Sequence, residues 1–298
     1  MASLKYRFWV MMLGLMGKKR NRATVEAFYA DVEKRRKTDN FEPPKELVSH
    51  FTVRREEVDG FPVISLKEKS TSVRQYLYYL HGGAYVGEIL PQQWEFIAQL
   101  AARTHAEVMV PIYPLAPEHK VGTVLSFARK ALHKLEARAN GLRIRMVGDS
   151  AGAGLAVALA QAEVAEKGKC SASQMVLVSP WVDVTMENAA IAGLEEADPW
   201  LTRIGLIEAG KCYAGDAGVR DARVSPTFGK LEGLPKTDIL IGTRDILLPD
   251  AKAFADKLSA AGVEFTYRQY PDMFHCWVML DMPETRRARE EIIGLLQS

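Results

Sequence analysis

A serine between two glycines is the side chain of this sequence best suited to act as a nucleophile. Ser150 stands in Gly-Asp-Ser-Ala-Gly at residues 148–152, directly after a short apolar run and directly before an alanine-rich stretch. A serine on a sharp strand-to-helix turn presents its hydroxyl to a substrate, and glycines two residues away on either side leave room for that turn. We therefore expect Ser150 at such a turn, where it could attack a carbonyl carbon.

A base and an acid for this serine follow later in the chain. A serine nucleophile needs a general base, and the base needs an acid that orients it. Asp245 and His275 each come directly after a predicted strand, so their side chains should reach the same sheet edge as Ser150. Asp272 is a rival acid three residues before His275, but it does not stand at a strand end. We therefore favour Ser150, Asp245 and His275 as the catalytic residues.

A glycine pair earlier in the chain is a candidate for stabilising the negative charge that such an attack creates. Gly82 and Gly83 follow a predicted strand in His-Gly-Gly-Ala-Tyr at residues 81–85. Backbone without a side chain lets N–H groups approach a ligand closely, and preorganised N–H donors stabilise an oxyanion. The N–H of Ala151, at the start of the helix after the serine, is a further donor. The alternative is a plain turn, and the serine motif favours an oxyanion loop.

The remaining histidines, acids and cysteines suggest structural roles. We expect His81 to shape the loop before Gly82, and Asp149 to brace the turn beside the serine. The other histidines lie in a linker, near helix ends or after an Ala-Pro-Glu turn: His50, His105, His119 and His133. The three cysteines are scattered, without the spacing of a metal site or a disulfide framework. We expect neither a metal nor a cofactor.

The elements that must position these residues alternate along the chain. Strands are predicted over 51–58, 62–66, 73–80, 106–112, 143–147, 174–178, 238–241 and 264–270, and helices over 94–103, 121–138, 154–167, 249–261 and 284–296. Such alternation predicts an α/β fold, in which helices cover both faces of a mostly parallel sheet. The first two strands flank Asp59-Gly60, which is typical of a hairpin.

Two segments interrupt the alternation and predict a cap over the site. Residues 182–226 have no convincing strand and follow a strand whose carboxyl end should face the ligand. Residues 1–45 predict two helices, and the first has an apolar stripe next to basic residues: Leu4, Phe8, Met11, Met12, Leu15 and Met16. This stripe either closes the pocket or lies on a membrane surface, and we favour the pocket. We expect one domain over 1–298, with a cap from 1–45 and 182–226 and a core from 46–181 and 227–298.

Composition and charge limit the partners. The chain has 298 residues, of which 48% are hydrophobic and 26% charged, with a net charge of +2. These values are ordinary for a soluble globular protein and give no reason to expect nucleic acid as a partner. The N-terminal apolar stretch is too short to span a bilayer, and no signal cleavage site follows it. We expect a cytoplasmic protein without stable membrane insertion, and leave a homodimer open.

Together these motifs resemble the hormone-sensitive lipase family of α/β-hydrolase esterases, in its bacterial carboxylesterase form. The resemblance covers about residues 76–277 and includes the loop at 81–84, the segment at 113–119, the serine motif and the surroundings of Asp245 and His275. It implies an α/β-hydrolase fold with an eight-stranded sheet and a helical cap. It also implies an oxyanion hole formed by the N–H groups of Gly83, Ala84 and Ala151, with Gly82 shaping the loop. The family usually has a third glycine where this chain has Ala84.

The function that follows is hydrolysis of a carboxylic ester. We expect a small-molecule ester with a short- to medium-chain acyl group as the substrate, and a serine, histidine and aspartate as the only catalytic machinery. A non-catalytic receptor for a small molecule on the same fold is one alternative. An amidase or peptidase with the same three residues is the other, and a comparison of rates on a matched ester and amide would separate it from an esterase.

Overall fold

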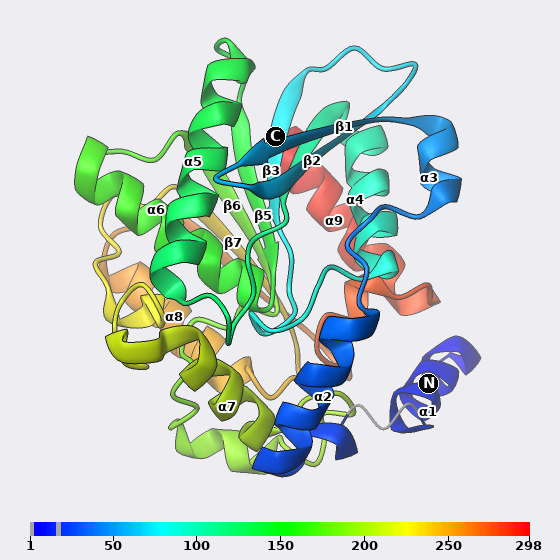
Figure 1. Ribbon diagram of the computed structural model, residues 1–298, viewed down its shortest axis with the longest axis vertical. Helices are drawn as coiled ribbons and strands as arrows, with labels where there is room; N and C mark the ends of the chain where they lie inside the picture. Colours follow the sequence, from blue (N-terminus) through cyan, green and yellow to red (C-terminus); the bar gives the residue numbers. More distant parts are fainter. Residues whose placement is uncertain (1–2, 16–18) are drawn as a thin grey trace.

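Eight strands form one sheet in the computed structural model, which describes residues 3–15 and 19–298 (Figure 1). The strands are β1 (Phe51–Val58), β2 (Phe61–Glu68), β3 (Gln75–Leu80), β4 (Ala106–Pro111), β5 (Ile144–Asp149), β6 (Ala172–Val178), β7 (Lys236–Gly242) and β8 (Phe265–Tyr270). Their order in the sheet is β1-β2-β4-β3-β5-β6-β7-β8. Strand β2 is antiparallel to both of its neighbours, and the strands from β4 to β8 are parallel. The predicted fold class is confirmed.

Helices cover both faces of the sheet. The helices of the core are α4 (Pro91–Thr104), α5 (Val121–Ala139), α6 (Ala151–Lys167), α8 (Leu248–Ala260) and α9 (Pro283–Gln297). One apolar core contains side chains of α5, α6 and α8, and a second contains side chains of α4 and α9. Every residue of β3, β4 and β5 is buried, as expected for parallel strands that are covered on both faces.

The strand order places two loops next to each other. Strand β3 pairs with β4 on one side and with β5 on the other. The chain therefore adds its next strands on opposite sides of β3, although all three strands are parallel. Leu80, the last residue of β3, pairs with Gly148 near the end of β5. The glycine pair at 82–83 and the serine at 150 therefore leave the sheet side by side. In open α/β sheets ligands bind at such a switch point.

The segments outside the sheet are helical. They contain α1 (Leu4–Leu15), α2 (Val25–Thr38), α3 (Lys45–His50) and α7 (Arg203–Ala214), and short 3-10 turns occur at Arg20–Arg22, Ala189–Gly193, Gly215–Ala217, Pro226–Phe228 and Trp277–Met279. Residues 182–226 contain no strand, as predicted. Helix α3 was not predicted, because six residues are too few to establish a helical period. Helices α2 and α7 pack against each other (Figure 1).

The prediction for the N-terminal helix was right about its existence and wrong about its buried face. Leu4, Phe8, Met11 and Leu15 of α1 are exposed by 84, 49, 55 and 70%, whereas Tyr6 and Leu13 are buried. Met16 lies outside the described residues. The helix is apolar on nearly every side, so a second helical stripe through Tyr6, Trp9 and Leu13 was equally available, and periodicity could not choose between them. No helix in the described part of the chain is long and apolar enough to cross a membrane.

Candidate active site

Ser150 occupies the strained turn that its glycines predict. It lies between the end of β5 and the start of α6, and its φ of 53° is in the left-handed region. Its N–H donates to the carbonyl of Val178 at 2.9 Å, which ties the turn to the neighbouring strand β6. A Cβ on Gly152 would lie 2.0 Å from the carbonyl oxygen of Leu80, and one on Gly148 would lie 2.7 Å from a backbone nitrogen of α6. Both positions therefore need glycine.

The three predicted catalytic residues meet at hydrogen-bond distance. His275 Nε2 lies 2.9 Å from Ser150 Oγ, and His275 Nδ1 lies 3.0 Å from Asp245 Oδ2. All three side chains are buried, although His275 lies 125 residues after Ser150 and 30 residues after Asp245 in the sequence. A proton on Nδ1 donates to the carboxylate, which leaves Nε2 free to accept the proton of the serine hydroxyl. This arrangement can activate a serine oxygen.

The electrostatics of His275 favour its charged form. Burial lowers the pKa of His275, but its neighbours together raise it by more, so the net pKa lies well above the usual value. Cys276 and Asp245 are the neighbours that raise it. Burial also raises the pKa of the Cys276 thiol to about 12, so this thiol is neutral and Asp245 is the negatively charged neighbour of His275. The imidazolium that forms during proton transfer is therefore stabilised by the carboxylate.

A second buried carboxylate supports the acid, and the sequence analysis missed it. Asp198 belongs to the segment at 182–226, and its Oδ2 accepts the N–H of Ile246 at 3.1 Å, next to Asp245. Its Oδ1 accepts the N–H groups of Trp200 and Leu201 at 2.8 and 3.0 Å. Burial, and then the charge of Asp245, raise the pKa of Asp198 to about 6. The only signal in the sequence was an Asp-Pro turn, which does not indicate a partner.

The glycine loop presents backbone N–H groups beside the serine. Gly82 donates its N–H to the Asp149 carboxylate, so it shapes the loop. Gly83 and Ala84 follow with φ values of 141° and 55°. Among the residues that the structure describes, the N–H groups of Gly83, Ala84 and Ala151 have no hydrogen-bond acceptor. They are therefore available to a ligand oxygen.

Two side chains brace this loop as expected. Asp149 accepts hydrogen bonds from Tyr79 Oη at 2.7 Å and from Gln93 Nε2 at 2.8 Å. His81 Nδ1 lies 2.8 Å from the carbonyl oxygen of Gly82, and its ring stacks on Tyr113 with 4.2 Å between the ring centroids. Burial lowers the pKa of His81 to about 4, so the ring is neutral and Nδ1–H donates to the carbonyl. The loop is held rigidly from both sides.

Two other sets of titratable side chains do not contact Ser150. The carboxylate of Asp272 is exposed, so it is not the buried acid that contacts His275. His133, Glu136 and Glu163 form a cluster whose ligand atoms lie within 4.8 Å of one another. Glu163 is already paired with Arg129 at 2.6 Å and with Lys167 at 2.8 Å. These cations already compensate the charge of Glu163.

A cavity of about 170 Å³ opens onto the serine and histidine. Its apolar lining comes from α1, from the segment at 200–206 and from the residues after His275: Trp9, Leu13, Trp200, Leu201, Leu206, Met279 and Leu280. Cavities for drug-sized ligands have typical volumes of 300–1,000 Å³. This one is suited to a smaller molecule with an apolar part.

Comparisons with known proteins identify the family and similar folds. A family model described as the alpha/beta hydrolase fold matches residues 77–279. An esterase of Acinetobacter venetianus is 32% identical over 228 residues, which cover 74% of each chain. An acetyl-hydrolase of Streptomyces hygroscopicus is 32% identical over 217 residues, which cover 72% of each chain. An esterase from the bacterial hormone-sensitive lipase family has a similar structure, with a TM-score of 0.83 and 24% identity over 100% of this chain and 98% of that one.

Proposed function

We propose a specific reaction for this chain, which belongs to the α/β-hydrolase fold family and is an esterase. The reaction is the hydrolysis of short- to medium-chain acyl esters, with Ser150 as the nucleophile. One observation carries the proposal: Asp245, His275 and Ser150 form a continuous line of contacts of 3.0 and 2.9 Å beside backbone N–H groups that lack an acceptor among the described residues. These are the parts that acyl transfer through a serine requires.

The reaction proceeds in two steps. Ser150 Oγ attacks the ester carbonyl while His275 Nε2 takes the hydroxyl proton, and His275 then returns this proton to the leaving alcohol. Water, deprotonated by the same nitrogen, attacks the acyl-enzyme and releases the acid, and His275 returns the proton to Ser150 Oγ. Asp245 keeps the imidazole in the tautomer that this exchange needs. The N–H groups of Gly83, Ala84 and Ala151 stabilise the oxyanion in both steps.

The size and lining of the cavity support a short or medium acyl group. About 170 Å³ of space with mostly apolar walls suits a few methylene groups and disfavours a long fatty chain. A similar esterase structure, EstE5 soaked with p-nitrophenyl butyrate, has a TM-score of 0.79 and 25% identity over 91% of this chain and 90% of that one. An ester with a four-carbon acyl group is therefore a suitable first substrate.

We also propose that residues 1–45 and 182–226 form a cap over a core of residues 46–181 and 227–298. The support is that each cap segment contributes to the cavity wall, through Leu13 and Arg35 from the first and Leu206 from the second. A cytoplasmic location and a homodimer stay predictions from the sequence.

Labelling with an active-site phosphonate tests the function. Wild type should become labelled on one serine, and Ser150→Ala should lose both the label and the hydrolysis of p-nitrophenyl butyrate. Ser259→Ala, an exposed position on α8, is the matched control and should behave like wild type. Persistent labelling of Ser150→Ala would exclude this serine as nucleophile. Absence of turnover in wild type would favour a receptor, and a faster rate on a matched amide would favour an amidase.

A further inference from the structure

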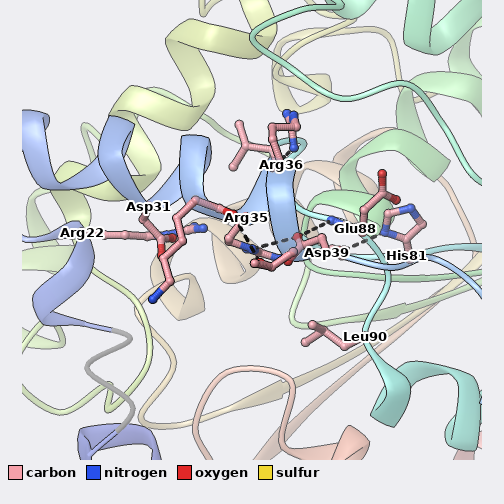
Figure 2. A network of polar contacts seen from close by, with 12 residues as sticks. Arg22, Asp31, Arg35, Arg36, Asp39, His81, Glu88 and Leu90 are labelled. Atoms are coloured by element: carbon pink, nitrogen blue, oxygen red, sulfur yellow. Dashed lines mark hydrogen bonds and ion pairs between the residues drawn. The ribbon is translucent and has the colours of Figure 1, made fainter.

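One wall of the cavity is charged, which simple ester hydrolysis does not require. Arg22, Asp31, Arg35 and Glu88 line the same space as Ser150, whereas most of the other lining side chains are apolar. Arg22, Asp31 and Arg35 come from the first cap segment, and Glu88 follows the oxyanion loop. Figure 2 shows these side chains in a row beside α2. Charges are expensive to bring into an apolar cavity, so this wall calls for an explanation.

Both arginines keep part of their hydrogen-bonding capacity free. Arg22 Nε donates to Asp31 Oδ2 at 2.9 Å, and Arg35 Nε donates to Asp39 Oδ2 at 2.9 Å (Figure 2). No acceptor among the described residues contacts the terminal nitrogens of either side chain. A guanidinium group presents five N–H donors in a planar fork. Each arginine can therefore donate to a ligand without losing its present partner.

The two guanidinium groups also repel each other. Burial lowers the pKa of Arg22, and the charge of Arg35 lowers it further, so the two cations are close enough to interact. Asp39, which pairs with Arg35, is not part of the cavity lining. Asp31 and Asp39 offset part of this repulsion. An anion in the cavity beside both arginines would offset it further, and the low dielectric of a buried site would strengthen the attraction.

Glu88 does not oppose an anion in this place. Burial raises the pKa of Glu88 to about 7, so its carboxyl group is partly protonated at neutral pH. Its Oε2 is buried and has no hydrogen-bond partner among the described residues. A protonated carboxyl group donates a hydrogen bond, which a ligand carboxylate can accept. The wall then offers three donors to one anionic group.

The charged wall lies directly beside the oxyanion loop. The guanidinium of Arg35 packs so closely against Gly87 that a Cβ at this position would lie 2.3 Å from Nη2. Gly87 donates its N–H to the carbonyl of Gly83 at 2.9 Å, in the loop that faces Ser150. Arg35 and Ser150 also line the same cavity, so one small molecule can contact both.

We propose that Arg22 and Arg35 form a subsite that binds a carboxylate of the substrate. The substrate class is a short ester with a free carboxylate in one half, such as a half-ester of a small dicarboxylic acid or an acylated hydroxy acid. The planar forks of the arginines match the two oxygens of a carboxylate. This proposal rests on the proposed hydrolysis at Ser150, and it adds which ester the cavity selects.

The test compares esters that differ in one terminal group. One pair varies the acyl half: mono-4-nitrophenyl glutarate against its methyl ester. The other pair varies the alcohol half: 4-acetoxybenzoate against its methyl ester. With the full-length protein, and after subtraction of the spontaneous rate, we expect the carboxylate member of one pair to have a kcat/KM about tenfold higher or more. The responding pair identifies the half that reaches the arginines.

Variants connect the preference to the subsite. Arg35→Gln and Arg22→Gln should each lower the ratio of kcat/KM between carboxylate and methyl ester about tenfold. Arg35→Lys keeps the charge but loses the fork, and should give an intermediate ratio. Lys37→Gln is the matched control, because Lys37 lies on the same helix, carries the same charge and is largely exposed. Its ratio should equal that of wild type.

The outcomes separate this proposal from the one on which it rests. Equal kcat/KM values within both pairs in wild type, or a ratio that Arg35→Gln leaves unchanged, would overturn the carboxylate subsite while ester hydrolysis stands. Failure to hydrolyse any of the four esters, together with an unlabelled Ser150, would overturn the esterase mechanism itself. Inhibition of wild type by free glutarate needs no variant. We expect glutarate to compete with p-nitrophenyl butyrate and glutaramide not to, and equal inhibition by both would also contradict the subsite.

Discussion

At the scale of single residues, Asp245 decides which nitrogen of His275 carries the proton. Its carboxylate lies 3.0 Å from Nδ1 and can only accept a hydrogen bond from it. Asparagine in its place can present an N–H group instead, which favours the wrong tautomer. We expect Asp245→Asn to fold and to lose roughly 10⁴ in kcat, as the same change does in a serine protease with this triad. Steady-state kinetics on p-nitrophenyl butyrate and a thermal melt measure the two effects.

The control for this change is the rival acid close to the histidine in sequence. Asp272 is exposed, so Asp272→Asn should stay within about twofold of wild type in kcat. If Asp272→Asn proves the more damaging of the two variants, the acid has been assigned to the wrong carboxylate.

The pH dependence of the reaction should report His275. Burial lowers its pKa, but Cys276 and Asp245 together raise it by more, so the folded pKa lies above the usual 6.5. The base must be neutral, so activity is present above the folded pKa and is lost as the pH falls through it. We expect the acid limb of kcat/KM to have its midpoint above about pH 6.5, and Asp245→Asn to shift that midpoint downward. A rate that stays flat down to about pH 5 would contradict a histidine base.

At the scale of elements, the oxyanion loop depends on glycine at one position and tolerates alanine at the next. A Cβ on Gly83 would lie 2.2 Å from the carbonyl oxygen of Gly87, and its φ is 141°. We expect Gly83→Ala to displace the loop and to lower kcat at least about 10²-fold, the loss seen when one oxyanion donor is removed. The kinetics and the phosphonate labelling rate of this variant provide the measurement.

The neighbouring position supplies the control. Ala84 has a φ of 55°, which costs alanine about 1–2 kcal/mol, whereas glycine loses about 0.5–1 kcal/mol of chain entropy on folding. Ala84→Gly should therefore be about 0.5–1 kcal/mol more stable than wild type by chemical denaturation. A loss of stability in Ala84→Gly, or full activity in Gly83→Ala, would show that the loop conformation differs from the one described.

The link between the cap segment and the catalytic acid runs through Asp198. Its carboxylate accepts three backbone N–H groups, two within its own segment and that of Ile246 beside Asp245. Asp198→Ala leaves all three donors without this acceptor, so we expect a loss of about 1–3 kcal/mol in unfolding free energy and about tenfold or more in kcat. Glu196→Ala, exposed and two residues away, is the control and should change neither quantity. An unchanged kcat in a destabilised Asp198→Ala would restrict Asp198 to a purely structural role.

The same elements explain what the sequence could and could not predict. Ser150, Asp245 and His275 were predictable because each follows a strand, and parallel strands bring their carboxyl ends to one edge. Asp198 and Arg35 were not, because each contacts the site only through packing of a cap segment, and no local pattern encodes that packing. Asp198 meets Ile246 across 48 residues, and nothing in the intervening chain marks the contact.

At the scale of the whole molecule, both segments of the proposed cap contact the loop that holds Asp245. Arg244, next to Asp245, donates to Tyr6 Oη of α1 at 2.7 Å and to the carbonyl of Ala197 at 3.0 Å. Lys19 donates to the carbonyl of Asp198 at 3.1 Å. The loop that holds the acid is therefore fixed by both cap segments at once. A displaced cap would alter the geometry of the catalytic acid as well as the cavity wall.

Helix α1 has one face toward the cavity and one face toward solvent. Trp9 and Leu13 line the cavity, whereas Leu4, Met11 and Leu15 are exposed. If the inner face forms part of the acyl site, Trp9→Ala enlarges that site. We then expect KM for p-nitrophenyl butyrate to rise severalfold, roughly 3- to 10-fold, and the preference to move toward longer acyl chains. A series of p-nitrophenyl esters from acetate to decanoate measures both.

A substitution on the solvent-exposed face distinguishes a role of α1 in the cavity wall from attachment to a membrane. Met11→Gln changes only the exposed stripe, so its kinetics on soluble esters should match wild type. Co-sedimentation with anionic vesicles measures the other property, since an exposed apolar stripe of this kind is also what a surface-bound helix presents. Unchanged kinetics in Trp9→Ala, together with vesicle binding that Met11→Gln abolishes, would contradict the cap assignment of α1. We expect the opposite pattern, because Tyr6 anchors the helix by donating to the carbonyl of Asp272 at 2.8 Å, and Trp9 of the same helix lines the cavity.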